Sequence, residues 1–278
     1  MDGDAFVGDD IGPWSEIKLE IIRQYAGVYS TIVAKQRRFH HIYVDAFAGA
    51  GVHRRKRTGE TLPGSPRIAL AVKPPFREYH FIDMQQKKVE SLEELAAGRT
   101  DVHVYRGDCN EIIPQKILPL ARYEDYRRAL CLLDPYGKQL RWEVIKQIAA
   151  ARSVEILLNF PVGALNRTVL PTHVDKLDPE DRAQLKAVWG DESWFDAAYT
   201  KTPGLFKEET IKASVESLGE AFRKRLHDVA GFRYVPKPVL MRNEKNAPLY
   251  YLYFATHNET GAKIVDQIFS KYRRHGLR

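Results

Sequence analysis

Four apolar segments of this 278-residue chain each end close to an aspartate, and the first is followed by two closely spaced glycines. The aspartates are Asp45, Asp83, Asp108 and Asp134, and the glycines are Gly49 and Gly51. Such a carboxylate can accept hydrogen bonds from ribose hydroxyls or from an adenine amino group, and glycine lets a ligand approach the backbone closely. The combination indicates a nucleoside-bearing ligand, although an aspartate in this place can also be only a helix N-cap, a role that suits Asp108.

Two cofactors would bring a nucleoside to this glycine loop. A dinucleotide favours the pattern Gly-x-Gly-x-x-Gly, in which the third glycine lets the next helix pack closely. Arg54 stands in the third position here, which disfavours a pyrophosphate and a nicotinamide-dependent oxidoreductase. S-adenosylmethionine has no phosphate and requires only close backbone approach and polar groups for its amino-acid end. We therefore expect S-adenosylmethionine as the cofactor, and no metal site.

The elements that hold these residues are predicted by alternating strand and helix patterns. From residue 41 to residue 161 apolar strand runs alternate with amphipathic segments, as in a parallel sheet covered on both faces. Ligands of such sheets bind outside the carboxyl ends of the strands, so the four aspartates are expected at one rim. Two further strands, 233–241 and 248–256, are joined by a short connection that requires an antiparallel pair.

We thus predict an α/β fold with a doubly wound, mostly parallel seven-stranded sheet, an antiparallel terminal strand pair and a helical insertion. The expected segments are an N-terminal tail and helix (1–37, of which 1–11 is a loose tail), a sheet domain (38–161 and 207–278) and the insertion (162–206). A helix is predicted over Glu208–Val229. The aromatic residues near Trp189 and Trp194 are expected to form a small core of the insertion or, alternatively, a docking surface.

Composition narrows the class of protein. The chain is 44% hydrophobic and 28% charged, which is ordinary for a globular protein. Its two cysteines, Cys109 and Cys131, form no CxxC cluster, so neither a zinc knuckle nor a disulfide framework is expected. There is no apolar run of membrane-spanning length and no apolar signal segment, and we expect a cytoplasmic protein. The net charge of +7 permits nucleic-acid binding without establishing it.

At this point the chain resembles a known family. The segments VDAFAGAG, FID, GDCNE and LLDPYG are similar to successive motifs of Rossmann-type S-adenosylmethionine-dependent methyltransferases. More narrowly, GSPRIAL, LLDPYG, WGDESW and LYYLYFATHNETGAKIVDQI resemble the three-Cys-motif partner proteins. The resemblance covers nearly the whole chain after residue 12. It implies a methyltransferase-like fold, S-adenosylmethionine as cofactor and a protein partner that bears the three cysteines.

The resemblance also implies roles for individual residues. The cofactor would be lined by Asp45, Phe47, Gly49 and Gly51, with Asp83 at the ribose and Asp108 at the adenine. The residues that would face the methyl group are Asp134, Pro135 and Tyr136. Enzymes that methylate amino groups of nucleic acids usually carry Asp/Asn-Pro-Pro-aromatic at this place, whereas here Tyr136 stands where the second proline would be. This chain therefore matches only part of the motif that accompanies methylation of a base amino group.

A run of positive charge follows the glycine loop directly. It comprises Arg54, Arg55, Lys56 and Arg57. A loop of such residues often only faces water, but this one lies where a substrate would enter, and RNA or DNA phosphates would be attracted to it. We expect a methyltransferase acting on a nucleic acid. The alternative is a non-catalytic, methyltransferase-like subunit that binds its three-Cys-motif partner or a nucleic acid.

Overall fold

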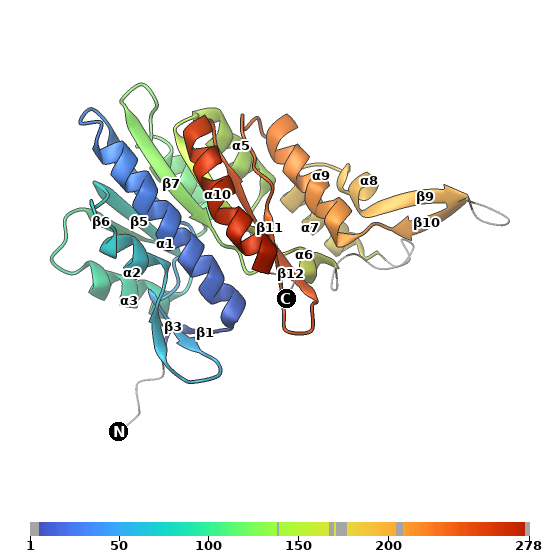
Figure 1. Ribbon diagram of the computed structural model, residues 1–278, viewed down its shortest axis with the longest axis horizontal. Coiled ribbons are helices and arrows are strands. Elements are labelled where there is room, and N and C mark those ends of the chain that lie inside the picture. The colour runs from blue at the N-terminus through green and yellow to red at the C-terminus, as the bar shows by residue number, and fades with distance from the viewer. Residues whose placement is uncertain (1–5, 138, 167–169, 171–176, 204–207, 276–278) are drawn as a thin grey trace.

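The computed structural model describes residues 6–137, 139–166, 170, 177–203 and 208–275. A seven-stranded sheet in the order β11–β12–β8–β7–β2–β5–β6 forms its centre (Figure 1). Its strands are β2 (His40–Asp45), β5 (Glu78–Asp83), β6 (Val102–Arg106), β7 (Arg127–Leu133), β8 (Val154–Phe160), β11 (Val239–Arg242) and β12 (Pro248–Ala255). The first five are parallel, and β12 runs antiparallel to both β8 and β11. The predicted fold class is confirmed.

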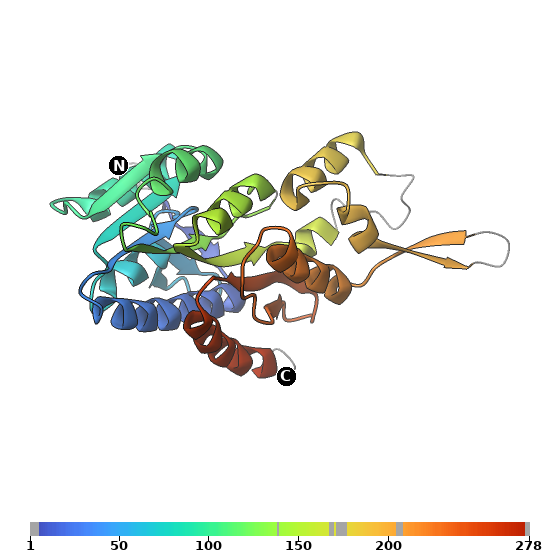
Figure 2. The same cartoon turned by 90° about the horizontal axis from the view of Figure 1, so that it is seen from above.

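Helices cover both faces of the sheet (Figure 2). One face is covered by α1 (Pro13–Ala34), α2 (Ser65–Ala71), α3 (Gln86–Ala96) and α10 (Glu259–His275). The other is covered by α4 (Cys109–Ile112), the π-helical turn η1 (Ile113–Ile117), α5 (Trp142–Ala151) and α9 (Val215–Asp228). Tyr43 and Val44 are neighbours on β2 and belong to opposite cores, and both are fully buried. Burial of both faces is why the middle of the strand, Ile42–Val44, contains no charged residue.

A second sheet of three strands corrects two expectations. It consists of β1 (Asp9–Ile11), β3 (Val52–Arg55) and β4 (Thr61–Pro63), with β3 parallel to β1 and antiparallel to β4. Residues 9–11 are therefore not part of a loose tail, and the basic run begins in a strand and not in a loop. These elements form without a long apolar run because β1 and β3 supply each other's backbone hydrogen bonds, and Arg54 pairs with Asp10 at 2.7 Å across them.

The insertion is only partly helical, which corrects the expectation of a helical insertion. It contains α6 (Val162–Ala164), α7 (Pro179–Trp189) and α8 (Trp194–Ala198), followed by the antiparallel pair β9 (Tyr199–Pro203) and β10 (Glu208–Lys212). The pair projects from the molecule in Figure 1. Helix α9 begins at Val215, where Ser214 Oγ accepts the Ser217 backbone N–H at 3.0 Å. The predicted start at Glu208 was wrong because the threonine-bearing segment pairs as a strand; parts of 162–206 lie outside the described residues.

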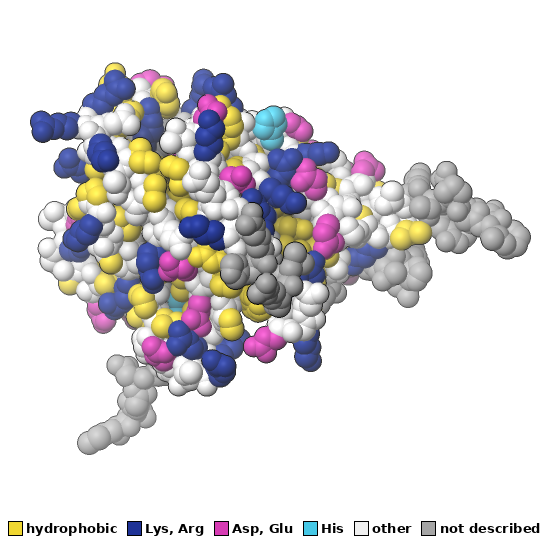
Figure 3. All heavy atoms as spheres, in the orientation of Figure 1, with side chains coloured by type: hydrophobic (Ala, Val, Ile, Leu, Met, Phe, Trp, Pro, Cys, Tyr) yellow, Lys and Arg dark blue, Asp and Glu magenta, His cyan; other side chains and the backbone are white. Residues whose placement is uncertain are grey.

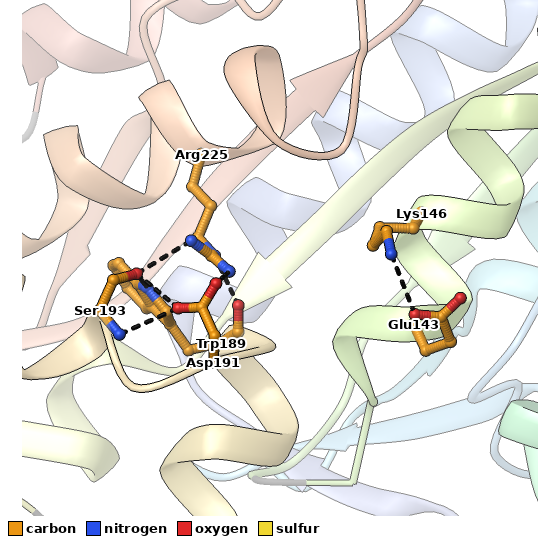
Figure 4. A network of polar contacts seen from close by, with 6 residues as sticks. All are labelled: Glu143, Lys146, Trp189, Asp191, Ser193 and Arg225. Atoms are coloured by element: carbon orange, nitrogen blue, oxygen red, sulfur yellow. Dashed lines mark hydrogen bonds and ion pairs between the residues drawn. The ribbon is translucent and has the colours of Figure 1, made fainter.

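The WGDESW segment joins the insertion to the sheet domain (Figure 4). The buried Arg225 of α9 donates to the Trp189 carbonyl at 2.5 Å, to Ser193 Oγ at 3.0 Å and to Asp191 at 2.6 Å. Hydrogen bonds from Ser193, together with Arg225, outweigh burial and lower the pKa of Asp191 to about 2. Trp189 and Trp194 belong to the same apolar core as the sheet, so they form neither a separate core nor an exposed docking surface.

Both cysteines are buried and free. Burial raises the pKa of the Cys109 thiol to about 12, so the thiolate is disfavoured and the side chain acts as a small apolar group. Among the described residues, none of the helices combines the length and the apolar character that a membrane span requires.

Candidate functional site

The loop after β2 adopts a conformation that requires its glycines. Gly49 and Gly51 have φ angles of +63° and +75°, in the left-handed region that a β-carbon disfavours. The loop is supported from behind by Gly64, whose backbone N–H donates to the Gly51 carbonyl at 2.9 Å. A β-carbon on Gly64 would lie 2.9 Å from the Gly51 carbonyl carbon. The GSP motif therefore holds the glycine loop closely against the start of α2.

Asp83, the last residue of β5, holds the same loop from the neighbouring strand. Its Oδ2 accepts the Gly49 backbone N–H at 3.0 Å, and its Oδ1 accepts that of Gln85 at 2.9 Å. Each carboxylate oxygen keeps a second lone pair, and the side chain is half-buried. Asp83 can therefore order the loop and still accept a hydrogen bond from a ligand hydroxyl.

Asp134 follows β7 and is held by residues from two other elements. Its Oδ1 accepts the Asn159 amide of β8 at 2.8 Å, and its Oδ2 accepts the Lys18 ammonium of α1. The partners lie 25 and 116 residues away in the chain. This network fixes the position of the carboxylate while leaving a lone pair on each oxygen for a ligand.

A cavity of about 320 Å³ opens beside Asp134, at the carboxyl ends of the strands. Five of the predicted site residues line it: Phe47, Gly49, Asp134, Pro135 and Tyr136. The structure thus brings the glycine loop and the Asp-Pro-Tyr segment to one cavity, as expected from the parallel sheet. The cavity is not lined by the other predicted cofactor residues, Asp45, Gly51, Asp83 and Asp108. Asp83 nevertheless accepts a hydrogen bond from Gly49, which does line it.

Sequence reasoning missed several polar residues of this cavity, among them Lys18, His53 and Asn159. The His53 Nδ1 and the Asn159 Oδ1 are buried and lack hydrogen-bond partners among the described residues. Burial and the nearby Lys18 lower the pKa of His53, so its ring is neutral near neutral pH. A buried polar atom without a partner is unfavourable, and a polar ligand in the cavity would supply the missing hydrogen bonds.

Strand β1 places a carboxylate over the glycine loop. Asp9 accepts the Tyr136 hydroxyl at 2.7 Å and the ammonium of the buried Lys88 at 2.9 Å, and a β-carbon on Gly49 would lie 3.7 Å from its Oδ2. Burial alone would raise the pKa of Asp9, but the hydrogen bonds from Tyr136 and Lys88 outweigh it and the pKa is lowered. The N-terminal strand is thus part of the site and not a free tail.

Asp45 lies beneath the site and is fully buried. Burial raises its pKa to about 7, against an opposing hydrogen bond from Ser65 and with a further increase from Asp134. Its Oδ2 has no hydrogen-bond partner among the described residues. Its Oδ1 accepts the Phe47 backbone N–H at 3.4 Å, so Asp45 supports the start of the loop, and direct contact with a cofactor stays a prediction.

This burial predicts a pH-dependent stability that Asp45→Asn removes. Because the pKa of Asp45 is higher in the folded protein than in the unfolded chain, protonation of this carboxyl stabilises the folded state. The contribution is complete at low pH and is lost as the pH rises through about 7. The wild type should therefore lose up to about 4 kcal/mol more of its unfolding free energy than Asp45→Asn between about pH 4 and about pH 8. Urea denaturation of both proteins across this range is the measurement, and parallel curves would contradict a raised pKa.

Asp108 acts as a helix N-cap in the structure. Its Oδ1 accepts the Asn110 backbone N–H at 2.9 Å at the start of α4. Asn110 in turn links this helix to the loop after Asp134, since its side chain donates to the Gln139 carbonyl at 2.7 Å and accepts the Arg141 backbone N–H at 2.8 Å. The N-cap role is confirmed, and contact with an adenine stays a prediction.

The basic run is divided by its ion pairs. Arg54 binds Asp10, and Arg55 binds both Glu16 at 2.7 Å and Glu60. Lys56 and Arg57 are exposed and form no ion pair with the described residues. The four residues therefore do not present four free charges, which weakens the sequence-based expectation for Arg54 and Arg55 and leaves it open for Lys56 and Arg57.

One cluster has side chains suited to a metal ion. Glu78, His80 and His103 place ligand atoms within 4.8 Å of one another. However, the Arg127 guanidinium lies 2.6 Å and the His40 ring 2.8 Å from the Glu78 Oε1. Arg127 supplies the positive charge that a metal ion would bring, so an ion-pair network explains these contacts.

Comparison with known proteins supplies no closer identification. No protein-family model matches the sequence, and a search of curated proteins found no match. The fold resembles protein LPL1258 from Legionella pneumophila (TM-score 0.47, 11% identity, 92% of each chain covered). It also resembles a dimethyladenosine transferase from Plasmodium falciparum (TM-score 0.43, 12% identity, 91% of this chain and 68% of that chain covered). At this level of likeness, function must be inferred from the site itself.

Proposed function

We propose that this protein is an S-adenosylmethionine-dependent methyltransferase. The observation that supports this proposal most directly is the arrangement of three parallel strand ends. The glycine loop after β2 is bonded to Asp83 at the end of β5, and Asp134 after β7 lines the same cavity. β5 and β7 lie on opposite sides of β2, and the strand connections reverse direction at such a point, where α/β sheets bind ligands.

The local backbone favours S-adenosylmethionine over a dinucleotide. In dinucleotide-binding folds the glycine loop runs directly into a helix whose N-terminus binds the pyrophosphate. Here Gly51 is followed by strand β3, and the next helix begins only at Ser65. Arg54 is paired with Asp10. The loop therefore provides close backbone approach without a pyrophosphate site, which suits a cofactor that has no phosphate.

The proposed roles follow from the contacts. Asp83 would accept the ribose hydroxyls, and Asp134, fixed by Lys18 and Asn159, would orient the acceptor. S-adenosylmethionine supplies an electrophilic methyl group, and alignment of the acceptor with it is the main contribution of the protein. With the cofactor bound, an acceptor nitrogen would take its methyl group, S-adenosylhomocysteine would leave, and the acceptor would have to lose a proton. His53, with a lowered pKa and an unpartnered Nδ1 in the same cavity, is placed to accept it.

We propose a nucleic acid as the methyl acceptor. A larger hollow of about 870 Å³ adjoins the cavity, and both are bordered by Ile11. Its lining includes Trp14, the exposed Lys56 and Arg57, and Lys245. An aromatic ring and cations that form no ion pair with the described residues, beside the reacting centre, fit an anionic, base-bearing substrate. The resemblance to three-Cys-motif partner proteins adds such a protein as the proposed partner.

A specific observation also favours the non-catalytic alternative. The Asp9 carboxylate lies over the glycine loop and is bound by Lys88 and Tyr136, so β1 covers part of the space where a cofactor would approach. For catalysis, β1 must either contribute Asp9 to the cofactor or move. A subunit that only binds a partner would retain this arrangement unchanged.

The test is calorimetric titration of the wild-type protein with S-adenosylmethionine, S-adenosylhomocysteine and NADH, followed by transfer assays with radiolabelled cofactor. We expect saturable binding of the first two ligands and methyl transfer to RNA or DNA, with or without the three-Cys-motif partner. Tight NADH binding would contradict the cofactor assignment. Cofactor binding without turnover on a broad nucleic-acid pool, even with the partner, would support the binding-subunit alternative.

A further inference from the structure

A second cavity, of about 510 Å³, lies at the opposite end of the sheet from the candidate active site. It is bordered by residues at the start of β7 and β8 and before α10, including Arg128, Arg152 and Asn258. From Arg128 to Asp134 the chain runs the length of β7, which corresponds to about 20 Å. Figure 3 shows Lys and Arg side chains gathered along this upper edge of the molecule. The cavity is therefore distinct from the proposed cofactor site.

The three arginines that border this cavity form no ion pair with the described residues. Arg152 and Arg233 are exposed and form no ion pair within the part of the chain that the structure describes. Among the described residues, Arg128 donates only to the backbone carbonyls of Tyr123, at 3.2 Å, and of Arg127, at 2.8 Å. Three guanidinium groups around one cavity repel one another, and an anion between them would relieve this repulsion.

The two carboxylates that border the cavity are already engaged. Glu155 is buried and accepts the Tyr25 hydroxyl and, at 3.2 Å, the Asn258 amide. Glu259 is paired with Lys263 at 2.8 Å. Neither forms an ion pair with the arginines, so the guanidinium groups remain available to a ligand.

Aromatic rings continue the surface beside the arginines. The Arg128 guanidinium lies 3.9 Å from the Tyr123 ring centre and 4.7 Å from that of Phe39. Arg38 lies 5.2 Å from the Phe39 ring centre and 5.1 Å from that of Tyr126. These cation–π contacts hold the side chains in place. Tyr123 and Tyr126 are nevertheless 51% and 48% exposed, so ring surface remains available for stacking.

We propose that this arginine–tyrosine face (Arg38, Tyr123, Tyr126, Arg128, Arg152 and Arg233) binds single-stranded nucleic acid. Guanidinium groups contact phosphates, and exposed aromatic rings stack on bases, which is how single strands are bound without sequence preference. A duplex keeps its bases stacked on one another and cannot use the tyrosines. An acidic protein could use the arginines but has no comparable use for the exposed rings. The face would anchor a strand at a distance from the active site.

The test is binding of a labelled oligouridylate, measured by fluorescence anisotropy across a salt series. Arg152→Ser with Arg233→Ser should lower the affinity and reduce the log–log salt slope by about 1.4, because each lost phosphate contact contributes about 0.7. Tyr123→Leu keeps an apolar cover over Arg128 but removes a stacking surface. It should lower the affinity roughly five- to a hundredfold at an unchanged slope.

Two double variants provide controls of equal charge change. Arg182→Ser with Lys186→Ser, on the exposed side of α7, should leave binding unchanged. Lys56→Ser with Arg57→Ser removes two cations at the opposite end of the molecule and tests the basic run predicted from the sequence. Thermal unfolding and S-adenosylmethionine affinity, measured on every variant, separate folding defects and any failure of the proposed enzymatic function from loss of this face.

Equal affinities and slopes for the wild type and Arg152→Ser/Arg233→Ser would overturn the proposal and favour an acidic protein as the occupant. A loss confined to Lys56→Ser/Arg57→Ser would likewise overturn it and place the nucleic acid at the active-site end. Equal binding of a duplex and of the single strand, unaffected by Tyr123→Leu, would contradict the stacking role.

Discussion

Asp134→Ala should reduce methyl transfer by at least about a hundredfold while S-adenosylmethionine affinity changes only a few-fold. In the proposed reaction Asp134 positions the acceptor, and an interaction at the reacting centre acts on the transition state more than on cofactor binding. The structure supports this role because Lys18 and Asn159 fix the carboxylate at the edge of the cavity. The measurements are the turnover number at saturating cofactor and the cofactor dissociation constant by calorimetry.

Two variants separate chemistry from folding in this experiment. Removing the Asp134 carboxylate leaves the half-buried Lys18 without its partner, so part of any loss could come from local disorder. Asp134→Asn keeps an oxygen that can accept from Lys18 and retains the side-chain volume. Glu143→Ala removes an exposed carboxylate that is paired with Lys146 at 3.3 Å on α5 and should have wild-type activity. Near-wild-type turnover in folded Asp134→Ala would show that the catalytic assignment is wrong.

Asp83→Ala should weaken S-adenosylmethionine binding by at least tenfold, consistent with roughly 1.5–3 kcal/mol for hydrogen bonds to a charged group. The substitution removes the proposed acceptor for the ribose and also the carboxylate that holds the Gly49 backbone N–H at 3.0 Å. Both losses act on cofactor binding, so this effect is expected in the dissociation constant. Calorimetry of the wild type and the variant is the measurement.

A second substitution at the same position separates the two contributions of Asp83. Asp83→Asn retains a side-chain oxygen that can accept from Gly49 but loses the charge, so its affinity should lie between those of the wild type and Asp83→Ala. Asp101→Ala, which removes a carboxylate paired with Arg99 at 2.7 Å, should bind the cofactor normally. Unchanged affinity in folded Asp83→Ala would remove this residue from the cofactor site.

The architecture of the sheet could be predicted from the sequence because its signals are local. Continuous apolar runs such as Leu130–Leu133 indicate strands buried on both faces, and the short connection before β12 requires an antiparallel neighbour. Once the strands are parallel, their carboxyl ends must share a rim. Consequently the meeting of Gly49 with Asp83, and the position of Asp134 nearby, follow from the strand pattern itself.

Short elements were harder to predict. Strands β1 and β3 contain charged residues and no apolar run, so no periodicity marks them, and each exists because the other lies beside it. The same holds for β9 and β10, which were predicted as parts of a helical insertion and a helix. A short polar strand is stabilised by its partner, and partner choice is a property of the folded chain.

Charged residues show most clearly what the tertiary structure alone decided. In the sequence, Arg54, Arg55, Lys56 and Arg57 are four equal positive charges, but folding brings Asp10 and Glu16 to the first two and leaves the other two exposed. In the sequence Lys18 is one of many lysines. In the folded chain α1 places it beside Asp134, which lies 116 residues away in the sequence. The strand pattern determined where the site lies, because periodicity is local. Ion pairing depends on distances between remote segments, so only the folded chain determined which charges are free to act.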